Sequence, residues 1–456
     1  MRGIYPSLLP WSAIPCFPIL FVLSFYILAS LKAQNGYHME QLSHVKIKEA
    51  ASSIWGYVHP DGREYALLGT MEGVRIYDLS DPANPVERAF IPGTSSPWRE
   101  LKTAGDFAYV STEAGDGLLI IDLRKAPSEF PYRFVHRFYN AAGDSFLIHS
   151  AHTLYVDEKN YIYLAGSRPT GPGFVILDPG PDPFQPVLLS YSDEAYHHEV
   201  HAFRDLLYGA ELYHGVFSIW DISDRQNPRR LSDQPTAKSF THSVWVERER
   251  EILYTADEVE GAVVEAWDVR DPDAIKRTDS YKVLQGASPY IIPHNVFHYR
   301  DKLYVSYYTE GMRVLDTKDP ENLIEVAYFD THDQNDRGFH GCWSVYPYYP
   351  SGICVASDIE NGLFVLQYDG NEPAYLHARI SDANDGSPIA NARLEIEQNG
   401  RIVTEFSNLQ GRLKSGFPEA DTVLVRVFKK GYHPYSRSVV LDKTNPLEME
   451  IPLVEL

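Results

Sequence analysis

The sequence lacks the short motifs that mark the common catalytic classes. It has no GxxxxGK[ST] phosphate loop, no GxGxxG behind a predicted strand, no GxSxG elbow and no CxxC pair. These absences disfavour nucleotide hydrolysis, dinucleotide-dependent dehydrogenation and a standard serine hydrolase. Basic residues are also scarce, with 41 Lys and Arg against 62 Asp and Glu and a net charge of −21. Because a nucleic-acid backbone needs a basic surface, we expect no nucleic-acid partner.

Cysteine is rare as well, with 3 in the chain, and Cys16 lies in an apolar N-terminal run. The other two, Cys342 and Cys354, flank a predicted hairpin loop at 346–352, which would set them opposite each other. In an oxidising compartment they are candidates for a cross-strand disulfide. Two buried free thiols are the alternative.

Long hydrophobic runs are confined to the N-terminus. Residues 14–31 are mostly apolar and precede Lys32-Ala33-Gln34, where a signal peptidase would cut after the small Ala33. The pattern predicts a signal peptide over 1–33 and export to the periplasm, the cell surface or the medium. Since the run is nearly long enough to span a bilayer, an uncleaved anchor is the alternative and the only membrane attachment that we expect.

What the sequence has in quantity is aromatic residues, with 31 Tyr, 21 Phe and 7 Trp, which favour strands. Seven segments share one pattern of strands, in which a third strand begins with a small residue, usually Gly, and ends near Asp. These third strands read GVRIYDLSDPANP, GLLIIDL, GFVILDPGPDP, GVFSIWDISDRQNP, AVVEAWDVRDPDA, GMRVLDTKDPENL and GLFVLQYDG. Six of them are followed by a turn and a predicted fourth strand.

The seventh segment stops at Gly370 without a fourth strand, and residues 43–50 (SHVKIKEA) have the length and alternation to supply it. Joining the two ends of the repeat in one sheet would close a ring and leave no open edge. The sequence therefore predicts an all-β protein with a seven-bladed β-propeller over 43–370. An open β-solenoid is the alternative.

The repeats carry a resemblance to a known family. The phrase GVRIYDLSDPANPV and its relatives resemble the LVIVD-type repeat of bacterial surface propellers, and residues 43–370 are similar to the "choice-of-anchor B" family of exported proteins. Residues 371–456 resemble the carboxypeptidase-regulatory-like (transthyretin-like) β-sandwich, on ISDANDGSPIANARLEI, TEFSNLQGRLKSGF and VLVRVFKKGYHPYSRSVVL. Such modules stabilise, space or bind, so the resemblance implies structural support for this tail.

Histidine recurs at one position of the repeat. The predicted first strands begin at His152, His198, His242, His294 and His340, and the corresponding places in the first two segments hold Trp55 and Trp98. The first strand of a propeller blade is innermost, so these residues would meet at one mouth of the axial channel. His197 and His201 beside His198 are interpreted as local packing or hydrogen-bonding residues.

Acidic residues recur where the second strands end, at Glu211, Asp257 and Asp358. In an antiparallel hairpin the start of one strand lies beside the end of its partner, which predicts three pairs. They are His198 with Glu211, His242 with Asp257, and His340 with Asp358. Imidazole beside carboxylate is the chemistry of a divalent transition-metal site.

Two interpretations of these histidines stay open. They would either tie neighbouring blades together by hydrogen bonds, or bind a ligand at the channel mouth. Trp55, Trp98, Arg99 and Glu199 are the further candidates for ligand binding, with Arg99 suited to an anion. We expect a monomeric binding or scaffold protein for a protein, glycan or small-molecule ligand. The alternative is a metal-dependent enzyme with histidine ligands and strand-end carboxylates as orienting groups or general bases.

Overall fold

β-Strands joined by turns make up the structure, a computed structural model that describes residues 36–167, 173–283, 290–332, 334 and 337–456. None of these residues lies in an α-helix, which confirms the predicted all-β class. The predicted signal peptide at 1–33 lies outside the described residues. Within the described ranges there is no helix with the length and apolar character needed to cross a membrane.

Strands β1 to β31 form seven sheets that follow one another along the chain. The first four sheets contain β3 (Ala51–Val58), β4 (Glu64–Thr70), β5 (Gly73–Asp78) and β6 (Val86–Pro92); β7 (Arg99–Ala104), β8 (Phe107–Thr112), β9 (Leu118–Asp122) and β10 (Tyr132–Val135); β13 (Thr153–Val156), β14 (Ile162–Ala165), β15 (Phe174–Asp178) and β16 (Val187–Ser192), with β11 (Arg137–Tyr139) and β12 (Ser145–Leu147) beyond β16; and β17 (Glu199–Phe203), β18 (Leu206–Glu211), β19 (Val216–Asp221) and β20 (Arg229–Pro235).

The other three sheets contain β21 (Thr241–Glu247), β22 (Ile252–Asp257), β23 (Val264–Asp268) and β24 (Lys276–Tyr281); β25 (Val296–Tyr299), β26 (Lys302–Ser306), β27 (Met312–Asp316) and β28 (Ile324–Phe329), with β1 (Gly36–Tyr37) beside β28; and β29 (Cys342–Tyr346), β30 (Ile353–Asp358), β31 (Gly362–Tyr368) and β2 (Met39–Val45).

The last of these sheets joins the two ends of the repeat region. β2 pairs antiparallel with β31, from Met39 opposite Tyr368 to Val45 opposite Leu363. The sequence predicted residues 43–50 for this strand, so the pairing begins earlier and ends earlier than expected. Met39 is buried, and a bulge between Gln41 and Ser43 resets the alternation. The apolar pattern therefore continues on the N-terminal side of the predicted segment.

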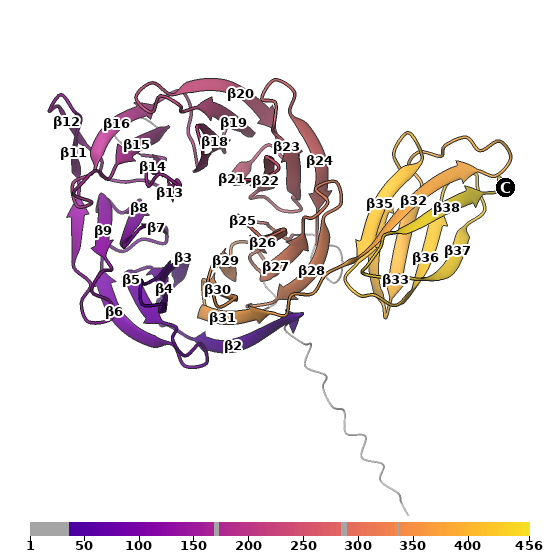
Figure 1. The fold of residues 1–456 in the computed structure, drawn as a ribbon, viewed down its shortest axis with the longest axis horizontal. Helices are drawn as coiled ribbons and strands as arrows, with labels where there is room; N and C mark the ends of the chain where they lie inside the picture. The colour runs from indigo at the N-terminus through magenta and orange to yellow at the C-terminus, as the bar shows by residue number, and fades with distance from the viewer. Residues whose placement is uncertain (1–35, 168–172, 284–289, 333, 335–336) are drawn as a thin grey trace, which may run out of the picture. The chain divides into compact units, whose positions relative to one another are not determined.

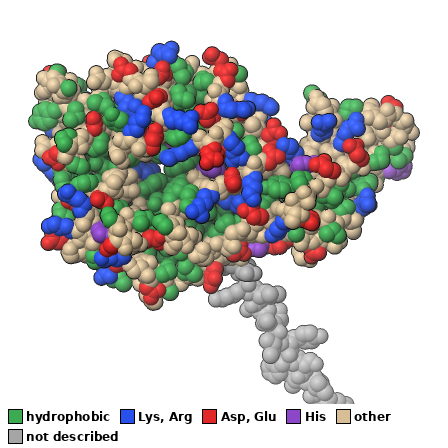
Figure 2. Space-filling view, in the orientation of Figure 1, with side chains coloured by type: hydrophobic (Ala, Val, Ile, Leu, Met, Phe, Trp, Pro, Cys, Tyr) green, Lys and Arg blue, Asp and Glu red, His purple; other side chains and the backbone are tan. Residues whose placement is uncertain are grey.

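The seven sheets are arranged around a ring, with the first strand of each sheet innermost (Figure 1). Contacts run from β3 to β7, β13, β17, β21 and β25 in turn, and β29 contacts both β26 and β3. Side chains at equivalent positions of the first strands are therefore brought together at the centre. Figure 2 shows hydrophobic side chains in a hollow at the middle of the ring, with side chains of both charges around it.

Burial across each sheet explains the sequence pattern. The second strands, such as β4, β8 and β22, are buried along their whole length because sheets pack on both of their faces. They consequently contain continuous apolar runs rather than alternating ones. Exposure among the fourth strands varies: β6 is mostly exposed, whereas β28 is mostly buried.

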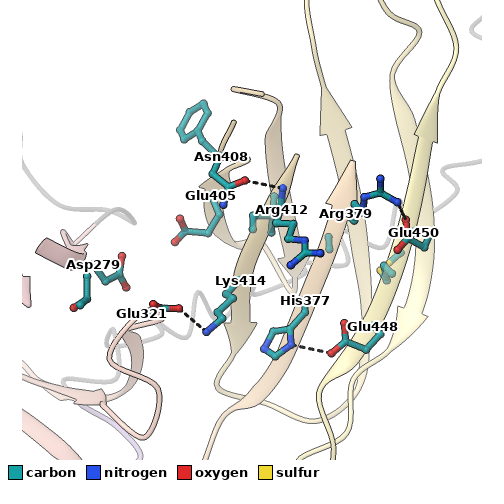
Figure 3. A pocket seen from close by; sticks show the side chains of 15 residues that line it. Asp279, Glu321, His377, Arg379, Glu405, Asn408, Arg412, Lys414, Glu448 and Glu450 are labelled. Carbon is teal, nitrogen blue, oxygen red and sulfur yellow. Dashed lines mark hydrogen bonds and ion pairs between the residues drawn. The ribbon is translucent and has the colours of Figure 1, made fainter. Parts of the chain in front are cut away.

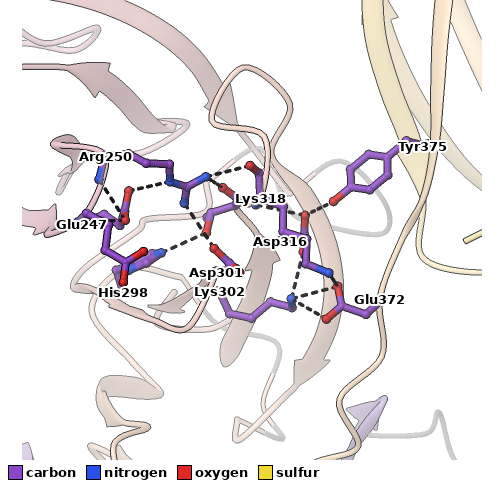
Figure 4. A network of polar contacts seen from close by, with 11 residues as sticks. Glu247, Arg250, His298, Asp301, Lys302, Asp316, Lys318, Glu372 and Tyr375 are labelled. Carbon is purple, nitrogen blue, oxygen red and sulfur yellow. Dashed lines mark hydrogen bonds and ion pairs between the residues drawn. The ribbon is translucent and has the colours of Figure 1, made fainter. Parts of the chain in front are cut away.

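Two further sheets form the C-terminal region, in the orders β35-β32-β38 and β34-β33-β36-β37. Their strands are β32 (Ala374–Asp382), β33 (Arg393–Gln398), β34 (Arg401–Phe406), β35 (Arg412–Phe417), β36 (Thr422–Phe428), β37 (Tyr435–Val440) and β38 (Leu447–Leu453). They enclose a hydrophobic core of their own. A polar network connects the ring to the segment that leads into them: Nζ of Lys302 lies 2.9 Å from Asp316 and 3.1 Å from Glu372, and Tyr375 donates to Asp316 (Figure 4).

The predicted disulfide is wrong, because Cys342 and Cys354 are both free and buried. Cys342 pairs with Asp358 at the end of β30, whereas Cys354 stands near the start of β30, opposite Leu366 of β31. The starts of two antiparallel strands lie at opposite ends of the hairpin. The two thiols are therefore held apart by the length of the paired region.

Candidate metal centre

Four of the five predicted histidines form a continuous row, called here the imidazole row. The ring centroids of His152 and His198 lie 4.0 Å apart, those of His198 and His242 4.3 Å apart, and those of His242 and His294 4.5 Å apart. Each residue lies at or near the start of the first strand of one sheet, so the contact between successive first strands brings the rings side by side, with their planes tilted by 38–49°. His198, His242 and His294 are buried.

Indole rings lie at both ends of the row, Trp98 beside His152 (6.2 Å between centroids) and Trp343 beside His294 (4.9 Å). Trp343, and not His340, occupies the equivalent position in the last sheet. It is the bulged residue between Cys342 and Ser344, as His242 is between Thr241 and Ser243.

The bulge explains why the predicted place of His340 differs from the observed one, since bulges are not visible in the residue count. The His340 side chain is 42% exposed, and its Nδ1 lies 2.7 Å from Glu360. It stands apart from the imidazole row.

The hydrogen bonds of two rings fix their tautomers. Nδ1 of His242 lies 3.2 Å from the carbonyl oxygen of His294, and Nδ1 of His294 contacts the carbonyl oxygen of Trp343. Because a carbonyl only accepts, Nδ1 is the donor in both rings and Nε2 carries the lone pair. These bonds tie successive sheets together, as one sequence interpretation expected, and they leave Nε2 available to a ligand.

Both Nε2 atoms face a carboxylate that the sequence interpretation did not include. Nε2 of His242 lies 3.6 Å from Oε2 of Glu258, and Nε2 of His294 lies 3.7 Å from Oε1. Tyr308 donates to Oε1 of the same carboxylate (2.6 Å). Each Nε2 lone pair thus lies near a carboxylate oxygen, and because the ring proton is on Nδ1, neither contact is a hydrogen bond. Two ligand atoms around a tetrahedral zinc ion are about 3.4 Å apart, given zinc–ligand bonds of about 2.1 Å.

His198 completes the group. The ligand atoms of His198, His242 and Glu258 all lie within 4.8 Å of one another. Nε2 of His198 is buried and has no hydrogen-bond partner among the residues that the structure describes. Burial and the neighbouring imidazoles hold the pKa of His198 well below its usual value, and burial lowers the pKa of His242 and of His294 to about 3. The imidazoles are therefore neutral near pH 7, the form that binds metals.

A small cavity of about 20 Å³ lies beside the row, among Trp98, His152, His242, His294 and Trp343. A volume of this size holds about one water molecule or ion.

The predicted acids at the strand ends do not meet the row. Glu211 accepts hydrogen bonds from Arg230 (2.6 Å) and His214 (2.9 Å) inside its own sheet. Asp257 accepts from the hydroxyl of Thr236 and the backbone N–H of Lys238, both at 2.6 Å. The predicted pairs His198–Glu211 and His242–Asp257 are therefore wrong. These carboxylates stabilise their own sheet or the loop that enters it, and the residue after Asp257, Glu258, reaches the row.

Asp358 belongs to a second group, together with His332 and Glu360, whose ligand atoms also lie within 4.8 Å of one another. Thr331 donates to Asp358 (2.7 Å), and Nδ1 of His332 lies 3.7 Å from Glu360. Glu360 is exposed and also contacts His340. The predicted partner of His340 was Asp358, and the structure places Glu360 there instead.

Of the other predicted ligand-binding residues, Trp98 and Arg99 line the small cavity beside the row, whereas Trp55 and Glu199 lie elsewhere in the ring. Arg99 is buried and donates to the carbonyl oxygens of Thr70 (3.1 Å) and Thr94 (2.8 Å), so its guanidinium is engaged with backbone and not with an anion. Trp55 pairs with Leu67 further along its strand, beyond a bulge between Ala51 and Ile54, and lies at the other end of the first strands.

Glu199 lies in the middle of the ring, where it lines a small space of about 10 Å³. It accepts hydrogen bonds from Asn295 (2.8 Å), Ser243 (3.1 Å) and the backbone N–H of Val244 (3.2 Å). Burial raises the pKa of Glu199 to about 8. This carboxyl group is a neutral part of the ring interior near pH 7.

A larger groove of about 850 Å³ lies beside the C-terminal sheets (Figure 3). Its charged groups mostly pair with one another, as in Lys414 with Glu321 and His377 with Glu448, both at 2.9 Å. Burial raises the pKa of Asp279 to about 6 and that of Glu405 to about 8. None of the predicted site residues lines this groove, and it holds neither of the two groups with converging ligand atoms found in the described ranges.

Comparison with known proteins gives no relative for this chain: no protein-family model matches it, and no curated protein matches it.

Proposed function

We propose that the chain is an exported seven-bladed β-propeller of the choice-of-anchor B kind, with a carboxypeptidase-regulatory-like sandwich after it. Seven successive sheets, the contact of β29 with β3 and the pairing of β2 with β31 support a closed ring. The apolar N-terminal run supports export. A pairing of first and last strands in one sheet is how propellers protect their edges.

The function proposed for the ring is to bind a divalent transition-metal ion through His198, His242 and Glu258, with His294 beside them. The observation that carries it is the position of two Nε2 atoms, each with a lone pair. Nε2 of His242 and Nε2 of His294 lie 3.6 and 3.7 Å from the carboxylate of Glu258. A cation at this point would turn a repulsive contact into coordination. Imidazole with carboxylate suits zinc, copper or nickel better than calcium or magnesium, which prefer oxygen.

Binding is the function proposed because the ligand atoms of His198, His242 and Glu258 lie within 4.8 Å of one another. The alternative, a metal-dependent enzyme, would in addition need room for a reacting molecule next to the ion.

Elemental analysis of the purified chain tests this proposal. Metal-free protein is incubated with equimolar zinc, passed through gel filtration and analysed beside the double variant H198A/H242A. His377→Ala is the matched control, because His377 pairs with Glu448 in the C-terminal sheets. His332→Ala reports on the second group.

We expect one zinc ion per chain in the parent and in the His377→Ala and His332→Ala proteins, and its loss in the double variant. Circular dichroism checks that every variant is folded. Zinc retained by a folded double variant, or absent from the folded parent, would contradict the proposal.

A further inference from the structure

The opposite end of the first strands carries a second cavity, of about 660 Å³, called here the aromatic cavity. Its volume lies within the range of ordinary small-molecule sites. Six aromatic side chains from the ring line it: Trp55, Tyr155, Trp245, Tyr299, Tyr346 and Tyr348. They come from β3, β13, β21, β25 and β29 and from the loop after β29.

These aromatic rings hold one another in place. Trp55 meets Tyr346 edge-on at 5.0 Å, and Trp245 meets Tyr155 edge-on at 5.8 Å. Trp245 and Tyr348 are nearly parallel, with 19° between their planes. Edge-on and offset contacts of this kind are the favoured aromatic geometries. The cavity wall is therefore formed before any ligand arrives, which lowers the entropy that binding must offset.

The rim of the aromatic cavity is polar and carries both signs of charge. Glu247, Glu249 and Asp301 line it together with Arg248 and Arg300. Arg250 fixes two of the carboxylates, at 2.9 Å from Glu247 and 3.6 Å from Asp301 (Figure 4). A rim of mixed sign creates little net field, so it favours a ligand without charge that both donates and accepts hydrogen bonds.

Cations of the chain already lie over aromatic rings of this cavity. Nζ of Lys102 stands 4.2 Å from the centre of the Trp55 ring, and the Arg300 guanidinium stands 4.9 Å from that of Tyr299. A ligand cation would be repelled by these groups where the cation–π attraction is strongest. An anion would meet three carboxylates at the rim. Both charged classes are thereby disfavoured.

His201 packs against two rings of the cavity wall but does not line the cavity itself. Its ring lies 4.4 Å from Tyr155 and 4.4 Å from Trp245. It is 0% exposed, and neither of its nitrogens has a hydrogen-bond partner among the described residues. A buried polar group without a partner destabilises a protein by about 1–3 kcal/mol.

The equivalent positions of the other first strands hold Trp55, Lys102, Tyr155, Trp245, Phe297 and Tyr346. His201 therefore belongs to a layer of mostly aromatic side chains that supports the cavity wall.

We propose that the aromatic cavity binds a neutral saccharide, with sugar rings against the aromatic faces and hydroxyl groups bonded to the polar rim. A sugar has the two faces that this site requires: C–H groups for the rings, and hydroxyls that donate and accept. This proposal does not depend on the metal site, which lies at the other end of the same strands.

The test uses the full chain and a panel of neutral disaccharides: cellobiose, maltose, lactose and diacetylchitobiose. Binding is followed by tryptophan fluorescence and by saturation-transfer NMR at millimolar sugar. We expect saturable binding of at least one of them. Absence of saturable binding by the whole panel overturns the proposal, as does saturable binding of choline in place of a sugar.

Variants then separate this site from a merely structural cluster. The exposed pair R248Q/E249Q, which lines the cavity, should weaken sugar binding about tenfold without changing stability. Trp98→Phe, at the other end, is the matched control and should leave sugar binding unchanged. Sugar binding as strong in the folded R248Q/E249Q protein as in the parent would contradict the proposed role of the rim.

Discussion

The two ends of the inner strands differ in chemistry although first strands of the same ring build both. In β21, His242 belongs to the imidazole row, and three residues later Trp245 belongs to the aromatic cavity. The small cavity beside the row measures about 20 Å³ and the aromatic cavity about 660 Å³. We propose an ion at the first end and a neutral saccharide at the second. A single repeat can therefore carry two sites, because each register position of the inner strands is copied around the ring.

The middle of the ring separates the two ends. The space there is about 10 Å³ and is lined by Glu100, Lys102, Glu199 and Asn295, among others. Lys102 forms an ion pair with Glu100, and Glu199 accepts three hydrogen bonds. Since this layer is filled and polar, we expect substitutions at one end to leave ligand binding at the other end unchanged.

The largest expected effect comes from removing an aromatic side chain of the wall. Trp245 is buried and touches Trp55, Tyr155, His201, Phe297 and Tyr348. Trp245→Ala should lower the free energy of unfolding by about 3–5 kcal/mol, measured by urea denaturation. The folded fraction should still bind zinc. Loss of zinc from folded Trp245→Ala protein would contradict the independence of the two ends.

The next largest effect concerns the stability contributed by Glu199, which lies in the middle of the ring, between the two ends of the inner strands. Burial raises the pKa of Glu199 to about 8, so the folded protein keeps a proton that the unfolded chain releases above about pH 4.3. Stability must then fall as pH rises from about 4 to 8.

Glu199→Gln should remove the part of the fall in stability that the ionisation of Glu199 causes. At pH 8 it should raise the free energy of unfolding by up to about 4 kcal/mol relative to the parent. Denaturation of both proteins at several pH values measures the difference. The pKa of Glu405 is also raised to about 8, but this residue is present in both proteins, so its contribution cancels in the difference between them. Parallel stability curves for the two proteins would refute the assignment.

A smaller effect is expected from the group that holds Glu258. Tyr308→Phe removes the hydrogen bond to Oε1 of Glu258 and should weaken zinc affinity about 10–100-fold. Tyr307→Phe is the matched control, because Tyr307 bonds the backbone of Ala262. Competition with a chromogenic chelator measures both affinities. Equal losses in the two variants would mean that the effect is general destabilisation.

The smallest effect is expected at the outer end of the imidazole row. Trp98 is 41% exposed, and within the described part of the chain its one ring neighbour is His152. Trp98→Ala should change the free energy of unfolding by less than about 0.5 kcal/mol. A larger loss would show that the indole ring supports the row.

The sequence was sufficient for the fold class and for the imidazole row. Both depend on repetition: the third strands recur seven times, and one repeat position holds His152, His198, His242 and His294. Hydrophobic alternation also indicated an N-terminal strand in the last sheet, although it begins at Met39 and not at Ser43.

The details of the site needed the structure. A bulge puts Trp343 where His340 was expected, and Glu258 reaches the row although Asp257 precedes it by one residue. The aromatic cavity could not be predicted, since its residues are spread over separate segments and resemble ordinary core residues. His201 was interpreted as a local packing or hydrogen-bonding residue, and in the structure it packs against Tyr155 and Trp245.

The most direct test of the metal site is the zinc-edge X-ray absorption spectrum of the zinc-loaded chain. The account predicts a shell of nitrogen and oxygen ligands at about 2.0–2.1 Å with the outer-shell scattering of imidazole. A shell with sulfur at about 2.3 Å, or one of oxygen alone without imidazole scattering, would contradict it.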